Sequence, residues 1–354
     1  MPGAQMAALP PKSQTGATAE LVAQAANVSR VAVSRAFNPA ASIKAEKRAH
    51  ILRIAEELNY VPNMAGRALS TQRSHLIGVI VPDVCSPWES QEIDALTTAL
   101  QNNGFATLLF KTQTDRSMDG TLLSYMRAHN PDSLVVFTEN VRPDQLLRAF
   151  DRAVPIYVDY PDDTGHSTLA SEGSAARFDR LCVRQTDGID QAVALMIGHG
   201  RRRFAVLSGN PKTTANAARL KVFGQILKAR GMPPAIRMSG DFSYEMGHAA
   251  TLSLFRVGKG ADAIFAANDV SAFGAIDALR FDLGLRVPED VNVVGFDDIR
   301  QASWRSYDLT TVRIDVDERV AALVRLILTR IKNPDAPSLV ETIRTRLVVR
   351  GTVG

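Results

Sequence analysis

The chain has 354 residues, more than a single compact core usually organises, so we expect a small module joined to a larger core of two lobes. Apolar residues make up 45% of it and charged residues 22%, and no apolar run approaches the roughly 20 residues of a membrane-spanning helix. Its two cysteines, Cys85 and Cys182, exclude a disulfide framework, and we expect a cytoplasmic protein.

Positive charge is concentrated at the start of the chain. Residues 1–75 hold nine lysine or arginine residues and four acidic ones, a net charge of +5, so the rest of a chain with a total of +4 carries −1. A basic segment at one end is typical of a nucleic-acid-binding module, although a solvated helix face is often basic as well. Charge alone therefore leaves both interpretations open.

Residues 1–17 are rich in Ala, Pro, Gly and Ser and lack the apolar stretch of a signal peptide, so we predict a disordered tail. Residues 18–38 then form two short helical patterns joined by a tight turn. In the first pattern, Val22, Ala23 and Ala26 recur at helical spacing. These three residues predict the buried face of a first helix.

The break between the two patterns falls at Asn27, because asparagine tolerates the left-handed backbone that a tight turn needs. Ser29 then caps a second helix, which Val33 and Phe37, four residues apart, pack onto the first. Five side chains are left to point outward: Arg30, Val31, Ser34, Arg35 and Asn38. A short helix that displays such side chains beside a packed partner is typical of major-groove recognition.

A third helix is predicted over roughly residues 44–58. Its apolar stripe consists of Ile51, Ile54, Ala55 and Leu58. The next segment, residues 63–75, has too few large apolar residues to hold a helix alone, because isolated helices this short are unstable in water. On the residues alone, a plain linker with Leu69 packed on the core is favoured over a hinge helix.

From residue 76 onward, apolar runs alternate with helical patterns. The runs predict strands at residues 76–81, 106–110, 133–137, 155–159, 204–209, 262–268 and 291–296. The patterns between them predict helices at residues 89–102, 118–129, 190–199, 217–229, 244–255 and 271–281. Continuous apolar strands that alternate with helices indicate doubly wound parallel sheets covered on both faces.

Polar side chains follow several of these strands. Asp83 and Ser86 follow the first strand, Asp159 ends the fourth, and Asn268 and Asp297 end two later ones. Because ligands of parallel sheets bind beyond the carboxyl ends of the strands, we predict a cleft between the lobes. Carboxylates and amides there suit the hydroxyl groups of a sugar.

Two aromatic residues also belong to this prediction. Trp88 and Phe242 can pack on the apolar face of a sugar, but each also fits a plain core position. Asn268 likewise fits the N-cap of the helix predicted at 271–281. The residues alone leave these alternatives open.

The ordered motifs of the chain resemble those of the lactose-repressor/galactose-repressor family of bacterial transcriptional regulators. The first motif is the two-helix pattern at 22–38, with VA, VS, VSR and N at the family's spacing. The others are ELNYVPN at 57–63, NMAGRALS at 63–70, IGV and PD at 77–83, AND at 267–269, GFDD at 295–298, LTT at 309–311 and LVVRG at 347–351. The resemblance runs from about Thr18 to the C-terminus.

The resemblance implies an α/β fold with an N-terminal three-helix helix-turn-helix module, a hinge helix, and a two-lobed periplasmic-binding-protein-like core of doubly wound parallel sheets. The implied segments are a tail at 1–17, a helix-turn-helix domain at 18–62, a hinge and linker at 63–75, and an effector-binding and dimerisation core at 76–354. Within the core, the implied N-lobe is about 76–160 and 306–335, and the implied C-lobe about 180–305 and 336–354.

The resemblance also implies a homodimer that binds a pseudo-palindromic operator DNA. The hinge would fold when two copies meet in the minor groove, with Leu69 as a wedge between base pairs and Arg67 on a phosphate. Arg30 and Val31 would govern the choice of base. The implied DNA-binding set is Ser29, Arg30, Val31, Ser34, Arg35, Asn38, Asn63, Arg67 and Leu69.

For the cleft, Asn268 and Asp297 match the family's AND and GFDD positions. Where the family has an arginine before a helix glycine, this chain has Lys221, and Arg219 is expected to point elsewhere. Lysine offers a mobile point charge instead of a planar fork, so the effector is expected to differ from common sugars or to be anionic, such as a sugar phosphate. The implied effector-binding set is Asp83, Ser86, Trp88, Asp159, Lys221, Phe242, Asn268 and Asp297.

The implied function is a sequence-specific transcriptional repressor whose operator binding is modulated by a small polar effector, with no catalytic residue, cofactor or metal site. The alternatives are a solute-binding protein without a role on DNA and an enzyme on the same fold. The missing signal peptide and the basic module argue against the first, and the lack of P-loop, dinucleotide-binding and nucleophile-elbow motifs argues against the second. The segment 161–181, longer than the family's usual connection, is predicted to be a surface loop that rims the cleft, joins an interface or has no role.

Overall fold

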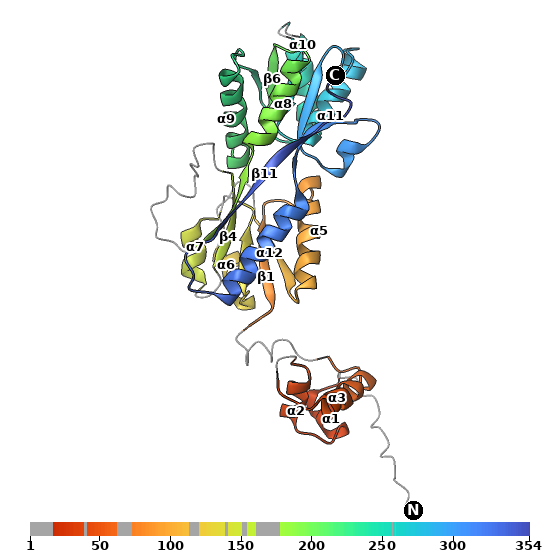
Figure 1. The fold of residues 1–354 in the computed structure, drawn as a ribbon, viewed down its shortest axis with the longest axis vertical. Coiled ribbons are helices and arrows are strands. Elements are labelled where there is room, and N and C mark those ends of the chain that lie inside the picture. Colours follow the sequence, from red (N-terminus) through yellow and green to blue (C-terminus); the bar gives the residue numbers. More distant parts are fainter. Residues whose placement is uncertain are drawn as a thin grey trace, which may run out of the picture. The chain divides into compact units, whose positions relative to one another are not determined.

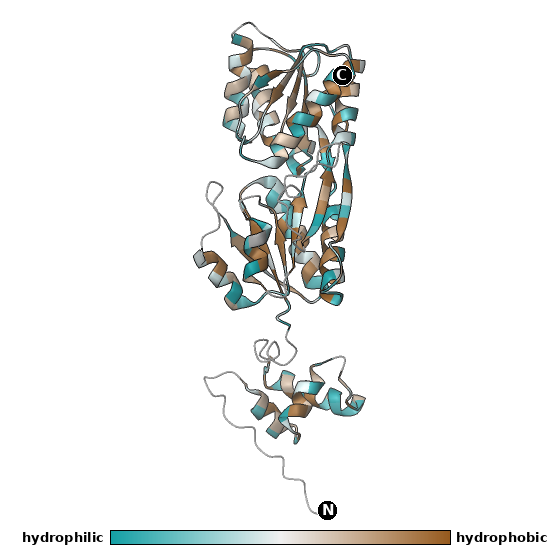
Figure 2. Cartoon of the chain, turned by 90° about the vertical axis from the view of Figure 1, so that its left-hand side faces the viewer, coloured by the Kyte–Doolittle hydropathy of each residue, from teal (hydrophilic) through white to brown (hydrophobic). Residues whose placement is uncertain are grey.

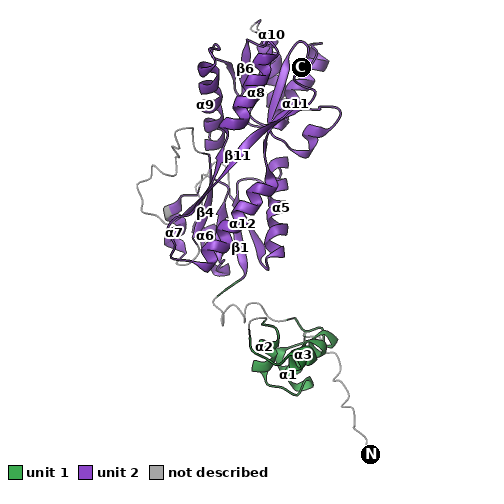
Figure 3. Ribbon diagram, viewed as in Figure 1, with its two compact units in different colours: residues 1–74 green, residues 75–354 purple. Residues whose placement is uncertain are grey.

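The computed structural model describes residues 17–38, 41–61, 73–112, 120–138, 141–150, 154–160 and 178–354, apart from residues 257 and 259. The chain divides into two compact units, residues 1–74 and 75–354 (Figure 3). Three of the predicted DNA-binding residues, Asn63, Arg67 and Leu69, lie outside the described residues. So do nearly all of the predicted tail and most of the predicted loop at 161–181.

The first unit contains the three predicted helices, α1 (Ala19–Ala25), α2 (Arg30–Ala36) and α3 (Ala45–Glu57). The Ser29 hydroxyl accepts a 3.2 Å hydrogen bond from the amide of Ala32 and caps α2. Asn27 has a φ of 51°, which confirms the predicted left-handed turn between α1 and α2. The buried apolar residues of this unit are Val22, Ala23, Ala26, Val33, Ala36, Ile51, Ile54 and Ala55.

The second unit is organised by a sheet that has eleven strands in the described part of the chain (Figure 1). The strands are β1 (Leu76–Val81), β2 (Ala106–Lys111), β3 (Ser133–Val136), β4 (Pro155–Asp159), β5 (Asp179–Arg184), β6 (Phe204–Leu207), β7 (Ile236–Met238), β8 (Ala263–Ala266), β9 (Asn292–Asp297), β10 (Thr310–Ile314) and β11 (Val340–Val348). Their order is β2-β1-β3-β4-β5-β11-β10-β9-β8-β6-β7. All neighbouring pairs are parallel except β10 and β11.

The long strand β11 joins two halves of this sheet, since its first part pairs with β5 and its last part with β10. We call β2-β1-β3-β4-β5 with their helices the first lobe, and β10-β9-β8-β6-β7 with theirs the second lobe. The helices of this unit are α5 (Pro87–Asn102), α6 (Gly120–His129), α7 (Pro143–Ala149), α8 (Thr186–Gly198), α9 (Thr214–Ala229), α10 (Tyr244–Arg256), α11 (Asp269–Asp277) and α12 (Val316–Lys332). All seven predicted strands and six predicted helices of the core are present, whereas β5, β7, β10, β11, α7 and α12 were not predicted.

Both faces of the first lobe's sheet are buried, as the continuous apolar strands predicted. Successive side chains of a strand point to opposite faces. Val79 of β1 accordingly packs in one apolar cluster with Leu96 of α5, while its neighbour Ile80 packs in another with Met126 of α6. Figure 2 shows the same concentration of apolar residues along the strands of both lobes. In the described residues, no helix is long and apolar enough to cross a membrane.

Candidate functional site

One candidate surface lies on α2 in the first unit. Of the six predicted recognition residues there, Ser29, Arg30, Val31, Ser34 and Arg35 are exposed and Asn38 is half-buried. Val31 is 61% exposed, which leaves it available for contact. The Arg30 side chain lies 3.3 Å from the Glu20 carboxylate of α1, and both side chains are exposed.

The end of α2 is fixed by an arginine that sequence reasoning missed. The guanidinium of Arg48 on α3 donates hydrogen bonds to the carbonyls of Ala36 (3.1 Å), Asn38 (3.0 Å) and Ala41 (2.8 Å). These bonds satisfy carbonyls that the helix end leaves open. A basic residue within a solvated helix gives no sequence signal for this role.

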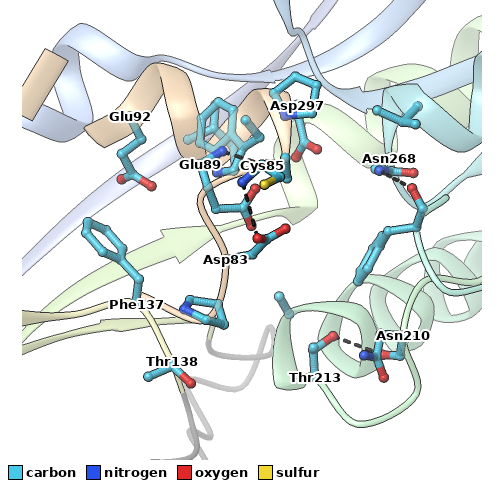
Figure 4. A pocket seen from close by; sticks show the side chains of 18 of the residues that line it. Asp83, Cys85, Glu89, Glu92, Phe137, Thr138, Asn210, Thr213, Asn268 and Asp297 are labelled. Carbon is cyan, nitrogen blue, oxygen red and sulfur yellow. Dashed lines mark hydrogen bonds between the residues drawn. The ribbon is translucent and has the colours of Figure 1, made fainter. Parts of the chain in front are cut away.

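The second candidate site is a cavity of about 740 Å³ within the second unit, in the range of small-molecule sites. Residues of both lobes line it, with α5 and α12 on one side and the ends of β8 and β9 on the other (Figure 4). Six of the eight predicted effector residues line it: Asp83, Ser86, Trp88, Phe242, Asn268 and Asp297. Among the described residues, no cluster of His, Cys, Asp and Glu is arranged to hold a metal ion.

Local turns position the first-lobe side chains. The Asp83 carboxylate accepts hydrogen bonds from the amides of Val84 (2.7 Å) and Cys85 (3.2 Å), which folds the chain back after β1. Ser86 is the N-cap of α5, and Trp88 in its first turn is buried. The carboxyl end of β1 therefore delivers these residues to the cavity.

In the second lobe, Asn268 has the N-cap role considered from the sequence. Its Oδ1 accepts a 3.1 Å hydrogen bond from the amide of Ser271 and caps α11, while its Nδ2 donates at 3.0 Å to the carbonyl of Phe242. Phe242 has a φ of 76°, and its ring lies against Gly209, where a Cβ would collide with it. Both residues still line the cavity.

The prediction for Lys221 is wrong. Lys221 is exposed and does not line the cavity, whereas Arg219 is 4% exposed and does. Side chains two residues apart on a helix lie on nearly opposite sides, so an inward Arg219 directs Lys221 outward. Because Lys221 does not line the cavity, it gives no support for an anionic effector.

Arg219 is held on several sides. Its Nε donates a 2.8 Å hydrogen bond to Oε1 of Gln185, and one terminal nitrogen donates to the carbonyl of Ala267. The guanidinium carbon lies 3.4 Å from the centroid of the Phe296 ring. Its other terminal nitrogen lies 3.9 Å from Oδ1 of Asp297. The planar fork is thereby fixed at the cavity wall.

Asp159 does not line the cavity, which corrects the second misplaced prediction. It is buried at the end of β4, and its carboxylate lies 3.7 Å from the guanidinium of Arg180 on the neighbouring strand β5. A carboxylate at the end of a strand therefore serves an ion pair between strands here.

A buried ion pair forms the cavity wall next to α5. The guanidinium of Arg319 on α12 donates hydrogen bonds to both carboxylate oxygens of Glu92 on α5, and it lies 3.4 Å from the hydroxyl oxygen of Tyr160. Arg319 is 1% exposed and Glu92 3%. Burial lowers the pKa of Arg319, but the charges of Glu92 and Tyr160 outweigh it, so the net pKa is raised and the arginine stays charged.

Two further carboxyl groups in the cavity have perturbed pKa values. Burial raises the pKa of Glu89, on α5, to about 7, and the charges of Glu92 and Asp83 add to this. Burial likewise raises the pKa of Asp297 to about 7, with Arg219 opposing the shift and Glu89 adding to it. Perturbed groups that converge on a cavity are typical of a functional site.

Comparison with known proteins gives two family matches. Residues 20–63 match bacterial regulatory proteins of the lacI family, and residues 193–353 match the periplasmic binding protein-like domain. The chain is 29% identical to the HTH-type transcriptional regulator CelR of Thermobifida fusca, over 94% of this chain and 97% of that protein. It is 28% identical to the HTH-type transcriptional repressor PurR of Pasteurella multocida (95% and 98%) and 27% identical to the ribose operon repressor of Escherichia coli (90% and 94%).

Solved structures agree on the fold. The lac repressor dimer bound to operator and the anti-inducer ONPF superposes with a TM-score of 0.82 at 24% identity, over 96% of this chain and 99% of that one. A complex of the transcriptional regulator CelR with cellobiose superposes with a TM-score of 0.66 at 26% identity, over 95% and 99%. A helix-turn-helix unit followed by a two-lobed core thus occurs in proteins of known structure.

Proposed function

Because this chain belongs to the lacI family of bacterial regulatory proteins, we propose that it is a transcriptional repressor whose affinity for operator DNA is set by a small polar effector. The observation that carries the proposal is the presence, in one chain, of an exposed recognition helix and a polar cavity between two lobes. Its relatives are transcriptional regulators, so we propose that it is not an enzyme and acts in the cytoplasm, where its DNA is.

On DNA, the exposed side of α2 would enter the major groove. In a homodimer, two such helices would meet two half-sites of a pseudo-palindromic operator. The lac repressor, whose fold this chain shares, has been seen as a dimer on its operator. The predicted contacts of Asn63, Arg67 and Leu69 in the minor groove remain part of this proposal.

In the cavity, the effector would bridge the lobes. Relatives bind cellobiose and ribose, so a sugar or sugar derivative is the expected class. Proposed contacts are Asp83, Ser86, Trp88, Phe242, Asn268 and Asp297, with Arg219 in the place first assigned to Lys221. Differential affinity for two arrangements of the lobes would couple the cavity to the DNA-binding unit, and by linkage operator DNA must change effector affinity by the same factor.

The test on the DNA side is Arg35→Ala. Arg35 is exposed on α2, and loss of a bidentate contact to guanine should weaken operator binding by about 1–3 kcal/mol and relax specificity at one position. The measurement is fluorescence anisotropy on an operator fragment selected from genomic DNA. Arg53→Ala is the matched control, because Arg53 is exposed on α3 and pairs with Glu57 at 3.0 Å. An affinity unchanged by Arg35→Ala would remove this residue from the base-reading set.

A further inference from the structure

The two buried arginines that line the cavity already donate hydrogen bonds to other groups of the protein. Arg319 donates hydrogen bonds to both carboxylate oxygens of Glu92 and lies beside the hydroxyl of Tyr160. Arg219 donates to Gln185 and to the carbonyl of Ala267. The lysines that also line the cavity, Lys111 and Lys212, are exposed. An anionic effector would therefore have to share both buried guanidinium groups with their protein partners.

Two carboxyl groups that line the cavity, those of Glu89 and Asp297, have fewer partners than Glu92 and Asp83. Asp297 is 9% exposed, and among the described residues its carboxylate accepts no hydrogen bond and has Arg219 as its nearest cation at 3.9 Å. Glu89 makes no ion pair with any described residue. Figure 4 shows the carboxylates of Glu89, Asp83 and Asp297 directed into the same space. A buried carboxylate without a partner is costly, and a ligand that supplies a cation would remove that cost.

Glu89 on α5 and Asp297 at the end of β9 line the same cavity from the two lobes, and the charge of Glu89 contributes to the raised pKa of Asp297. Glu89 faces Glu92 on its own helix, Asp83 after β1, Asp297 and Arg219 from the second lobe, and Arg319 on α12. Carboxyl and guanidinium groups therefore lie together in this cavity, and Glu89 is a carboxyl group among them that has no ion pair with a described residue. Neutral polar groups complete the wall, among them Thr138, Asn210 and Asn268, and these suit hydroxyl groups.

We infer that the effector carries a protonated primary amine beside hydroxyl groups, as in an amino sugar, and that this ammonium group binds between Glu89 of α5 and Asp297 of β9. The inference rests on the proposed function and names the chemical class of its effector. Binding at both carboxylates would draw the two lobes together across the cavity. A neutral sugar would leave Glu89 without a cation and Asp297 with only the 3.9 Å contact to Arg219, and a sugar phosphate would add a further negative group beside them.

The experiment compares matched ligands on the purified full-length chain. Glucosamine, galactosamine and mannosamine are each tested beside the parent sugar and the N-acetyl derivative, with 1,4-diaminobutane and glucose 6-phosphate as further probes. Calorimetry is expected to show at least one amine binding at least about tenfold more tightly than its parent and its N-acetyl partner. Tighter binding of the diamine would identify an aliphatic amine as the source of the ammonium group.

The matched variants are Glu89→Gln and Asp94→Asn. Glu89→Gln removes the charge but keeps the shape, so amine affinity should fall roughly 30-fold or more. Asp94 lies exposed on the same helix outside the cavity, and Asp94→Asn should leave amine affinity unchanged. Glu89→Gln should melt at or above the wild-type temperature at neutral pH, because it removes one of several neighbouring carboxyl groups. A loss of amine binding in this variant would therefore not reflect unfolding.

The pH dependence gives a readout that a structural role of Glu89 would not change. Raised pKa values of about 7 leave both carboxyl groups partly protonated at neutral pH in the free protein. An ammonium group binds their ionised forms, so amine affinity should rise as pH rises from about 5.5 to about 7, by up to about tenfold per pH unit for each proton released. The parent sugar should show no such rise.

Three results would overturn the inference: equal or tighter binding of the parent or N-acetyl sugar, tighter binding of glucose 6-phosphate, or no amine-dependent binding in any series. None of these three results bears on the proposal that the chain binds operator DNA, because operator binding is measured separately by anisotropy. Failure of the proposed function would instead appear as loss of sequence-specific DNA binding.

Discussion

Arg319→Met should lower the free energy of unfolding by about 3–5 kcal/mol. Methionine replaces much of the aliphatic volume of the arginine, but it leaves the Glu92 carboxylate, 3% exposed, without its cation in the wall of the cavity. A buried carboxylate without a partner must take up a proton or draw in water, and both change the packing of α5 against α12. Chemical denaturation of the full chain, followed by far-UV circular dichroism, measures the loss.

Two further variants show whether the loss of stability comes from an unpaired buried charge. The double variant Glu92→Leu/Arg319→Met removes both charges and should recover most of the lost stability, because a buried ion pair and an apolar pair of similar volume are often equivalent. Arg325→Met breaks the more exposed pair with Glu341, 2.6 Å apart, and should cost no more than about 1 kcal/mol. A loss for Arg319→Met as small as that for Arg325→Met would show that Glu92 does not depend on its partner.

Arg219→Lys should weaken effector binding by about 2–5 kcal/mol, which is roughly 30-fold or more. Lysine keeps the positive charge near Asp297 but loses the planar fork that reaches Gln185 and the Ala267 carbonyl together. Lys221→Ala is the matched control on the same helix, because Lys221 is exposed and outside the cavity.

The measurement for Arg219→Lys is calorimetric titration with the tightest binder of the matched sugar series, alongside the melting temperature of each variant. Arg219→Lys should bind weakly while still unfolding cooperatively, and Lys221→Ala should bind like the wild type. Weakened binding in Lys221→Ala with normal binding in Arg219→Lys would return the contact to the residue first predicted from the sequence.

Local signals made the first unit predictable. Asn27 at a left-handed turn, Ser29 at a helix cap and the spacing of Val22, Ala23 and Ala26 each act within a few residues, and the structure has all of them. The bonds from Arg48 to the end of α2 cross a loop, and no local pattern marks them.

In the core, the predicted strands are those with continuous apolar runs. β11 escaped prediction because it alternates apolar residues with Glu341, Arg344 and Arg346 and joins two lobes instead of lying inside one. β5 follows a Gly- and Ser-rich stretch that read as loop through residue 181, whereas the strand begins at Asp179.

Strand ends were a useful guide to the cavity, although Asp159 ends β4 and does not line it. Asp83, Asn268 and Asp297 follow strands, and all three line it. The helix position was misjudged by two residues, which exchanged Lys221 for Arg219. The pair Glu92 and Arg319 is 227 residues apart in the sequence and meets only through the packing of α5 against α12.

The central claim is that the cavity and the DNA-binding unit of one chain are coupled, and it is tested most directly by measuring operator affinity with and without the bound effector. Anisotropy on the selected operator fragment, titrated with the tightest amine of the matched series, should show a change in Kd of about 5- to 150-fold. Calorimetry in the presence of operator should then show the same factor in amine affinity. An amine that binds the cavity while operator affinity stays constant would contradict the account.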